Sequence, residues 1–588
     1  MNRLLLFSIG SVQEYIMESK KLIDLTNSSA MISSIMNGVK TIIEEDFGGT
    51  IILPYGEVCE NIQTSNQLLI IYDAEKSKAY EIEKKVKNQF KACIQKLMKN
   101  DKNVQNLKEE MDEELEELIE SYWVEVELKE KDYEEVYKKA YYSLEAIKNT
   151  RVFQNEEEKE KLKGRKCSIC GKRNIRFYKK INRKKDLHEN AVEIQSSQLK
   201  EKEGLCIPCY IKRCLPQDEE KIQNSTAKIA LGRWIEENEN KDYYKELEKI
   251  ATEKAKESKH GKYQLLYKEN SLKEISPEKK EEIENYYETL TKKQEKYYCI
   301  YRFDIDNLGK WMSGEYKEDK NQSLQEYQQE LSMKIHGFFK KSIAFFEKNK
   351  NNTLVYTGGD DLLGLFNVED SFRFSREIEK EFKRIFQSKE NEKFKKLTFS
   401  QGLFIIHYKD TLKESLKITK ERLEAIKESF GSMHHKQEKN GLIIAVLTDG
   451  YEYKEFYFKN HINRKYIIDS LINIFNCFHD NKFTFFHNEL AKMFISLDEY
   501  EELEEKRTIR DMIFVQQKRL IRRSNKKEKQ EGQNNKVERE IKKLQKRLEE
   551  IFYANTFDQG TVGLKNYFNM LYIMEKIHII LKEDDQNE

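Results

Sequence analysis

The sequence predicts an α+β protein with two ferredoxin-like units, a four-cysteine insertion and a helical connector between them, and a helical domain after them. Three observations lead to this prediction. The order strand, helix, strand, strand, helix can be read twice along the chain, and it is the order of a split βαβ unit. Two Cys-x-x-Cys pairs stand between the two copies. The other segments are rich in Lys and Glu, and the whole chain has four prolines, which favours long helices.

The predicted domains occupy five consecutive ranges. They are a first ferredoxin-like unit at 1–150, a zinc-binding insertion at 151–216, a helical connector at 217–296, a second ferredoxin-like unit at 297–459 and a helical carboxy-terminal domain at 460–588. A chain of 588 residues is long enough for several domains with separate cores.

The composition limits the partners and the compartment. The chain has 105 basic and 104 acidic side chains, so any nucleic-acid-binding surface must be local. No run of about 18 apolar residues is present, and the start of the chain does not have the form of a secretory signal. Four of the nine cysteines stand in Cys-x-x-Cys pairs, which fits a metal site in a reducing compartment. We therefore expect a cytoplasmic protein that does not span a membrane.

The first unit begins with a buried strand. Residues 3–10 form an apolar run that ends at Gly10, and Ser11 is a suitable N-cap for the helix that follows. The further elements predicted are a helix to about residue 45, strands at 50–54 and 67–73, a helix at 74–98, a charged helical stretch at 101–121, a strand at 122–128 and another helix.

The insertion has the strongest metal-site signal. Its two pairs are Cys167 with Cys170 and Cys206 with Cys209, and 35 residues separate the pairs. Four thiolates at this spacing suit tetrahedral Zn²⁺, and no accompanying residue indicates an open catalytic position. We predict a structural zinc site, the alternative being cysteines that are simply buried. Cys214 is expected to be a bystander.

The second unit repeats the order of the first. Its predicted elements are a strand at 298–305, a long helix at 308–348, a hairpin at 353–366, a helix at 370–387, a strand at 397–407, a helix at 411–428 and a strand at 442–447. The strand ends align Phe7-Ser8-Ile9-Gly10 with Phe303-Asp304-Ile305-Asp306. Acids occur only in the second copy, so we expect only this copy to bind catalytic metal ions.

A Gly-Gly-Asp-Asp tip lies in the hairpin of the second unit. Gly358 and Gly359 supply the backbone freedom of a tight turn and allow a ligand to approach closely. Asp360 and Asp361 repel each other unless a cation binds there. Carboxylate oxygens suit Mg²⁺ or Mn²⁺, which in turn hold nucleotide phosphates. The alternative interpretation is a solvated Gly/Asp turn.

A second acidic motif ends the first strand of this unit. Asp304 would lie beside Asp360 and Asp361, because the first strand of a ferredoxin-like sheet is adjacent to the hairpin. Asp306 points to the same face as Asp304 only if the strand continues; otherwise it is turned away or caps the next helix. Three carboxylates at one sheet edge predict a two-metal site for phosphoryl transfer.

The turn after this strand predicts a contact with phosphates. Asn307 and Gly309 offer backbone N–H groups at a helix start, and Lys310 offers a positive charge. The predicted nucleotide-binding set in this unit comprises Asp306, Asn307, Gly309, Lys310, Gly358 and Gly359.

The carboxy-terminal domain contains a basic run. It comprises Lys518-Arg519, Arg522-Arg523 and Lys526-Lys527. A charge run is usually a solvated face, and contact with RNA or a partner is the alternative.

The ordered combination of motifs resembles a known family. The stretch Phe303–Gly314, the Gly-Gly-Asp-Asp tip and the segment Ser400–Lys409 look like the large palm-domain subunit of type III CRISPR effector complexes. The start of the chain, Phe7–Ile16, is similar to the amino-terminal palm of the Cmr (type III-B) branch, and the four-cysteine insertion between the palms also matches. The resemblance implies two palm domains of the nucleotidyl-cyclase type.

The resemblance also implies an activity. In this family the second palm converts ATP into cyclic oligoadenylate second messengers when the complex binds target RNA. Carried over to this chain, Asp304, Asp360 and Asp361 bind two Mg²⁺ or Mn²⁺ ions, and Ser8 and Gly10 lie where the first palm holds the acceptor nucleotide. The implied partners are the other subunits of an antiviral effector complex, crRNA, target RNA and ATP.

The sequence departs from many family members at its start. They carry an amino-terminal HD nuclease domain, whereas the first palm begins here at residue 3. The only His-Asp pair is His479-Asp480, which we interpret as accidental, so DNA cleavage by this subunit is not expected. Some members of the Cmr branch without the HD domain join AMP to S-adenosylmethionine instead. That reaction is an alternative here, and Glu57 is a candidate contact for the amine of such an acceptor.

Two other functions agree with parts of the sequence. A cyclic dinucleotide synthase of the GGDEF type shares the palm topology, but the tip here reads Asp-Asp-Leu, and the double palm and the zinc insertion argue against it. A non-catalytic scaffold subunit would have vestigial acids. The intact aspartates argue against a scaffold, because a carboxylate cluster without its metal is destabilising.

Overall fold

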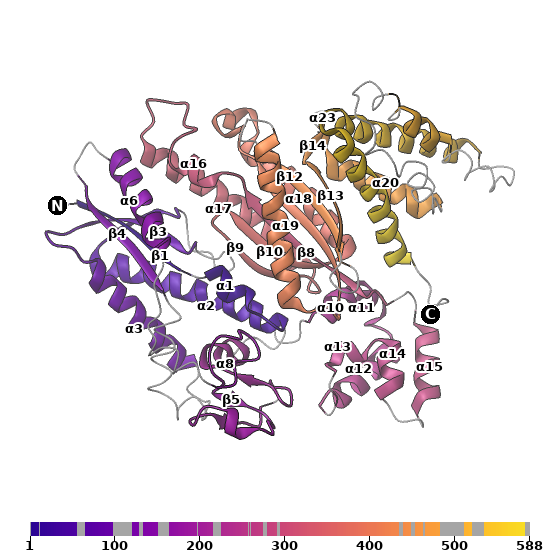
Figure 1. The fold of residues 1–588 in the computed structure, drawn as a ribbon, viewed down its shortest axis with the longest axis horizontal. Coiled ribbons are helices and arrows are strands. Elements are labelled where there is room, and N and C mark those ends of the chain that lie inside the picture. The colour runs from indigo at the N-terminus through magenta and orange to yellow at the C-terminus, as the bar shows by residue number, and fades with distance from the viewer. Residues whose placement is uncertain are drawn as a thin grey trace.

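The computed structural model describes most of the chain. The described residues are 2–10, 12–55, 65–97, 120–128, 133–150, 164–196, 198–215, 225–256, 258, 260–274, 279–290, 294–433, 439–447, 453–462, 465–481, 508, 511–519 and 534–582. Within these ranges the chain has a mixed α/β architecture with two main sheets, as predicted (Figure 1).

The first sheet comprises the four strands predicted for the first unit. They are β1 (Asn2–Ile9), β2 (Thr50–Leu53), β3 (Gln67–Asp73) and β4 (Ser121–Glu127), in the antiparallel order β2-β3-β1-β4. The helices of this unit are α1 (Val12–Met17), α2 (Leu22–Thr41), α3 (Ala79–Leu97) and α6 (Tyr133–Lys148). Ser11 and residues 101–119, part of the predicted charged helix, lie outside the described residues.

The two faces of the first sheet pack against different partners, because successive side chains of a strand point to opposite faces. Leu5 and Phe7 face a core shared with α2, α3 and the insertion. Leu4 and Leu6 face α6, whose Tyr137 belongs to the same hydrophobic core as the second unit. Helix α6 therefore joins the two units.

The insertion folds around its cysteines and is fastened to the first unit. It comprises β5 (Phe177–Tyr178), β6 (Val192–Glu193), β7 (Gly204–Leu205) and α8 (Ile207–Cys214). Arg213 of α8 is fully buried and donates a hydrogen bond of 2.8 Å to Asp24 of α2. The Lys212 ammonium is also buried and donates bonds of 2.7 Å to the carbonyl oxygens of Tyr15 and Glu18 at the end of α1. Buried charges that are satisfied in this way fix the position of α8 on α1 and α2.

The second sheet has six strands. They are β8 (Tyr297–Ile305), β9 (Thr353–Gly358), β10 (Asp361–Asn367), β11 (Phe399–His407), β12 (Gly441–Leu447) and β13 (Tyr453–Lys459), in the order β13-β12-β11-β8-β10-β9. Its first four strands in chain order lie in the same arrangement as those of the first sheet, β9-β10-β8-β11. Strand β12 then adds parallel to β11, and β13 adds antiparallel to β12.

The helices of the second unit are α16 (Leu308–Met312), α17 (Leu324–Lys348), α18 (Val368–Phe386) and α19 (Leu412–Met433). The prediction of one helix over 308–348 was wrong, because the chain leaves the helix after Met312 and resumes it at Leu324. Gly314 adopts a φ of +79°, which a helix does not allow. Ser323 then starts α17 with a capping box in which Glu326 is the partner.

The connector covers one face of the second sheet. It contains α10 (Thr226–Ala230), α11 (Gly232–Asn238), α12 (Asp242–Lys254), α13 (Lys262–Leu265), α14 (Lys268–Glu274) and α15 (Lys280–Thr289). Although this segment is rich in charged residues, its Trp234, Leu266 and Tyr267 are buried in a core that includes Ile300 of β8. The charged residues of the segment lie mainly on its outer side, and their number hid the few buried apolar positions from the sequence analysis.

The carboxy-terminal region packs on the outer strand of the second sheet. Its long elements are α20 (Ile467–Asn481), which contains His479 and Asp480, and α23 (Asn534–Lys582), whose Asn566 forms hydrogen bonds with the backbone of Tyr457 in β13. From the predicted basic run, Lys518 pairs with Glu549 at 3.4 Å, whereas residues 520–533 lie outside the described residues. None of the described helices is long and apolar enough to cross a membrane.

Candidate active site

The Gly-Gly-Asp-Asp segment forms the predicted tight hairpin. Strand β9 ends at Gly358 and β10 begins at Asp361, which leaves Gly359 and Asp360 as the turn. Gly359 has a φ of +65°, a conformation that favours glycine. A Cβ atom at Gly359 would lie 3.7 Å from the Ser65 hydroxyl, so the first unit approaches the turn closely.

The strand register brings the acids of the two motifs together. Asp304 in β8 lies directly opposite Asp361 in β10, and Ser400 of β11 lies on its other side. Burial, together with the charge of Asp304, raises the pKa of Asp360 to about 6. Burial and the charges of Asp360 and Asp304 also raise the pKa of Asp361. Three neighbouring, partly buried carboxyl groups favour a cation or bound protons at this edge of the sheet.

Two helices place cationic and amide groups against these acids. The Lys427 ammonium of α19 donates a hydrogen bond to Asp304, and the two side chains are 15% and 16% exposed. The side-chain amide of Gln13 in α1 donates a hydrogen bond of 2.9 Å to the Asp361 carboxylate. The Lys420 ammonium of α19 donates to the side-chain oxygen Oε1 of Gln13. Sequence reasoning missed all three residues. The available signal was that Lys420 and Lys427 are seven residues apart and so share one helix face.

The donor set suits a hard divalent cation. Carboxylate oxygens are the usual ligands of Mg²⁺ and Mn²⁺, and the raised pKa values of Asp360 and Asp361 show that added positive charge would stabilise the cluster. Asp304 and Asp361 are register partners and Asp360 precedes Asp361 in the turn, but among the described residues only the four cysteines bring three or more possible ligand atoms within 4.8 Å of one another. Oxygens of Asp304 and Asp361 are occupied by Lys427 and Gln13. An incoming ion would therefore compete with Lys427 for Asp304.

Asp306 lies at a different place from Asp304. It is 1% exposed, and it accepts hydrogen bonds of 2.8 Å from Thr398 and from Ser400 and of 2.7 Å from the backbone N–H of Asn440. The side chain thus ties the end of β8 to the neighbouring strands β11 and β12. This is the arrangement expected if the strand breaks at Asp306, and the predicted nucleotide contact would require these bonds to break.

The turn after β8 holds the other predicted phosphate contacts. Asn307 adopts a φ of +55° before α16. Lys310 is paired with Glu315 at 3.4 Å. Gly309 lies under Tyr141 of α6, because a Cβ atom at this glycine would be 3.1 Å from the Tyr141 hydroxyl.

The corresponding position of the first unit lacks acids. Ser8 of β1 lies opposite Gln67 of β3, the register position that Asp304 and Asp361 occupy in the second sheet. The Ser8 hydroxyl is fully buried and has no hydrogen-bond partner among the described residues. A side chain at Gly10 would collide with the ring of Tyr122. Glu57 lies outside the described residues.

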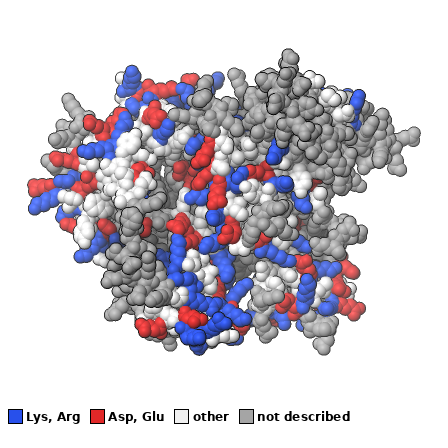
Figure 2. All heavy atoms as spheres, in the orientation of Figure 1, with Lys and Arg blue, Asp and Glu red and all other residues white. Residues whose placement is uncertain are grey.

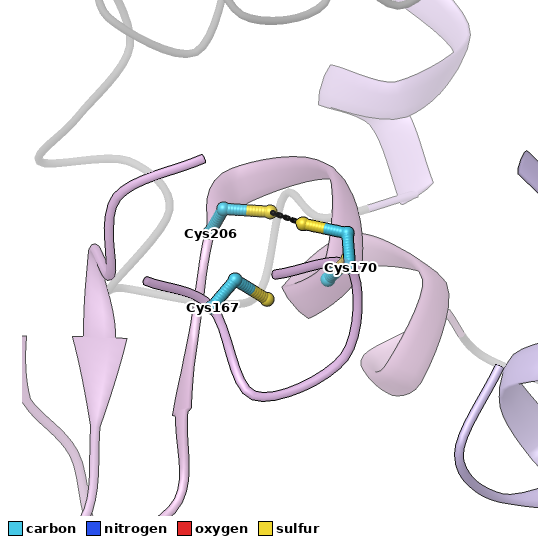
Figure 3. A group of neighbouring side chains, drawn as sticks. Cys167, Cys170 and Cys206 are labelled. Atoms are coloured by element: carbon cyan, nitrogen blue, oxygen red, sulfur yellow. Dashed lines mark hydrogen bonds between the residues drawn. The ribbon is translucent and has the colours of Figure 1, made fainter. Parts of the chain in front are cut away.

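The four predicted zinc ligands converge in the insertion. The sulfur atoms of Cys167, Cys170, Cys206 and Cys209 all lie within 4.8 Å of one another, and all four residues are buried. Figure 3 shows three of them, Cys167, Cys170 and Cys206. The Cys170 and Cys206 sulfurs are 3.8 Å apart, which agrees with the spacing of about 3.8 Å expected for two thiolates at about 2.3 Å from a tetrahedral zinc ion. Cys214 is not part of this group. The residues therefore fit a closed Zn²⁺ site.

Removing the Lys427 charge tests whether it acts as a counter-ion for the acids. In Lys427→Met we expect the free energy of unfolding without divalent metal to fall by about 2 kcal/mol, because Asp304 keeps a mostly buried charge without its partner. Mn²⁺ should restore more stability to this variant than to the wild type, as measured by thermal unfolding with and without Mn²⁺. Lys420→Met on the same helix is the control, and equal Mn²⁺ effects in all three proteins would contradict the prediction.

Comparison with known proteins agrees with this arrangement. Residues 297–439 match the family model for the second palm domain of Cas10/Cmr2, and residues 4–121 match the model for the amino-terminal region of the CRISPR-associated protein Cmr2. The chain is 27% identical over 309 residues to the CRISPR system Cmr subunit Cmr2 of Pyrococcus furiosus, a match that covers 45% of this chain and 34% of that protein. The chain thus spans about a third of the length of this curated relative.

Two solved structures share the fold over most of the chain. A type III-B Cmr-beta complex bound to cognate target RNA contains a chain with a TM-score of 0.59 and 14% identity, covering 87% of this chain and 78% of that one. The apo state of Cmr-beta gives a TM-score of 0.57 and 15% identity, covering 89% and 77%. At these identities the likeness concerns the fold.

Proposed function

Because this chain belongs to the Cas10/Cmr2 family, we propose that it is the target-RNA-activated nucleotidyltransferase of a type III CRISPR complex. It would use ATP and two divalent metal ions to make a cyclic oligoadenylate. The observation that carries the proposal is the pairing of Asp304 with Asp361 beside the Gly-Gly-Asp-Asp turn. The proposed partners are the other subunits of the complex, crRNA and target RNA.

We infer that both units are ferredoxin-like palms. The support is the same strand arrangement, second-third-first-fourth, in the two sheets. On this basis we keep the proposed domain limits of 1–150 and 297–459 for the palms, with the zinc insertion, the connector and the carboxy-terminal domain as in the sequence prediction.

In the proposed reaction, Asp304, Asp360 and Asp361 hold Mg²⁺ or Mn²⁺. Bound metal ions would lower the pKa of the attacking hydroxyl and neutralise the triphosphate. Gly358 and Gly359 leave the turn open to the nucleotide. Lys427 would be released from Asp304 by the metal and would then place its charge beside the phosphates.

The acceptor side would be formed by the first unit. Gln13 contacts Asp361 and Ser65 lies against Gly359 in the Gly-Gly-Asp-Asp turn, and Tyr141 lies over Gly309 in the turn after β8. Residues of three separate segments of the first unit therefore lie against these two turns. Ser8 and Gly10 remain proposed acceptor contacts. The neutral Ser8–Gln67 pair at the position of the acids favours an acceptor that brings no metal ion of its own. S-adenosylmethionine, to which the same site could transfer AMP, is therefore a second candidate.

One assay distinguishes these functions. The reconstituted complex is incubated with labelled ATP and Mg²⁺ or Mn²⁺, with and without matching target RNA and S-adenosylmethionine. We expect an adenylate product that requires target RNA. If product formation also requires S-adenosylmethionine, the product is assigned as the AMP adduct of S-adenosylmethionine and not as a cyclic oligoadenylate. Product without RNA would contradict the regulated activity, and no product under any condition would leave a scaffold role.

A further inference from the structure

The zinc insertion carries a large local charge. Residues 164–215 contain 14 Lys and Arg against five Asp and Glu, a net charge of +9, whereas the whole chain has a net charge of +1. A zinc ion with four thiolates reduces the excess to +7. The rest of the chain is therefore net acidic as a whole, and the insertion is one of two strongly basic segments, the other being residues 518–547 with 13 Lys and Arg against four Glu.

The charges lie on the outer side of the module. Figure 2 shows Lys and Arg gathered at the lower edge of the molecule, the region of β5 and α8 in Figure 1. The exposed basic residues of the insertion are Arg165, Lys172, Lys180, Arg183, Lys184, Lys185, Lys200 and Lys202. The inner side is occupied, since Lys212 and Arg213 are buried against α1 and α2. We call the exposed set the outer basic face.

Acidic neighbours neutralise part of this face. Lys172 pairs with Glu14 and, at 2.8 Å, with Glu18 of the first unit, and two further pairs lie within the insertion. Lys180 pairs with Glu201 at 2.6 Å and Lys184 pairs with Glu193 at 2.8 Å. All four side chains are well exposed or nearly so, and such pairs contribute little stability, so a polyanion can replace the carboxylates. Arg183 and Lys185 add charge beside Lys184 in the same short segment.

The composition of the face favours a nucleic acid over a protein as its partner. Protein interfaces usually have a buried apolar or aromatic centre. In the described part of the insertion no large hydrophobic side chain is exposed. A dense group of Lys and Arg without an apolar centre suits a phosphate backbone, because each neutralised phosphate releases condensed counterions.

We propose that the outer basic face of the zinc module binds the phosphate backbone of single-stranded RNA. The zinc site and the buried anchors of α8 hold the face rigid, so binding requires little ordering of the protein. The inference rests on the proposed function only for the source of the RNA, which would be a strand of the effector complex. It assigns an RNA contact to a segment more than 140 residues away in sequence from the Gly-Gly-Asp-Asp turn.

The test compares two triple variants of the full chain. Arg183→Gln, Lys185→Gln and Lys202→Gln remove three charges from the outer basic face. The control, Lys245→Gln, Lys249→Gln and Lys256→Gln, removes three exposed charges from the connector, where acidic residues balance the basic ones. Binding of a fluorescein-labelled single-stranded RNA of mixed sequence is measured by anisotropy over a salt series, together with zinc content and thermal unfolding.

We expect the outer-face variant to bind RNA about 10- to 100-fold more weakly at 0.1 M salt. The slope of the logarithm of the association constant against the logarithm of the salt concentration should become less steep by about 2, because three phosphate contacts are lost. The control should bind like the wild type. Equal RNA affinity in both variants would overturn the proposal, as would an outer-face variant that keeps its RNA affinity but no longer assembles with the other subunits. ATP turnover is measured separately. If the complex never turns over ATP, the proposed function is refuted, but a loss of RNA affinity in the outer-face variant would still support this inference.

Discussion

Replacing Asp360 and Asp361 together with asparagine is expected to lower the rate of adenylate formation at least about 10³-fold, a change of about 4 kcal/mol in transition-state stabilisation. The substitution keeps the size of both side chains and removes the negative charges that would hold the metal ions. Target RNA should still bind, and the complex should still assemble.

The same variant should be at least as stable as the wild type when no divalent metal is present. Burial and mutual repulsion raise the pKa values of Asp360 and Asp361, so the native fold works against their ionisation. Removing the charges relieves this repulsion, as is common where a site is built for function. Thermal unfolding in EDTA, beside the labelled-ATP assay, measures both effects.

The control for this experiment is Asp306→Asn. Asp306 is buried and accepts three hydrogen bonds, so its replacement should lower stability. Adenylate formation within tenfold of the wild type in the Asp360/Asp361 variant would show that the turn does not bind the catalytic ions. If the Asp360/Asp361 variant is less stable than the wild type in EDTA, the two aspartates stabilise the fold, and the prediction is wrong.

Replacing Cys206 with serine is expected to abolish zinc binding and to unfold the insertion. The apparent binding free energy of a structural Zn²⁺ is about 10–16 kcal/mol at pH 7 in small zinc domains. The strands of the insertion form a single three-stranded sheet with two residues in each strand, which cannot replace this contribution. The zinc content per chain, by mass spectrometry of the metal, and the thermal unfolding profile measure the result.

Cys214→Ser is the matched control for this prediction. Cys214 ends the same helix, α8, but lies outside the four-sulfur group, so this variant should keep one zinc ion per chain and the wild-type unfolding temperature. Retention of zinc by Cys206→Ser, or its loss from Cys214→Ser, would contradict the assignment of the ligands.

Local patterns were sufficient to predict much of the fold. The apolar runs of β1, β3 and β8 end next to glycine or aspartate, and that of β10 begins at the acidic turn, so their bounds could be predicted to within a few residues. The cysteine spacing predicted a group that the structure brings together. The charged connector was harder, because Trp234 and Tyr267 are too widely spaced among Lys and Glu to form an obvious stripe.

The surroundings of the acids could not be predicted in the same way. Gln13 reaches Asp361 across 348 residues of sequence, and Lys427 reaches Asp304 across 123. Such contacts depend on how two units pack, which a single sequence does not encode in any short pattern. The exact position of Asp306 likewise depended on Asn440, whose backbone N–H lies directly before β12, 134 residues further along the chain.

Helix α6 has a consequence for how the chain is made. Its Val136 and Tyr137 lie in one hydrophobic core that contains Leu4 of the first sheet and also Trp311 and Leu324 of the second unit. A ribosome completes the first unit long before Leu324 is synthesised, so one side of α6 stays uncovered in the nascent chain. Chains released early would expose this apolar side, and such surfaces promote aggregation. The two units are therefore best regarded as a single folding unit that becomes complete only after the second sheet has been translated.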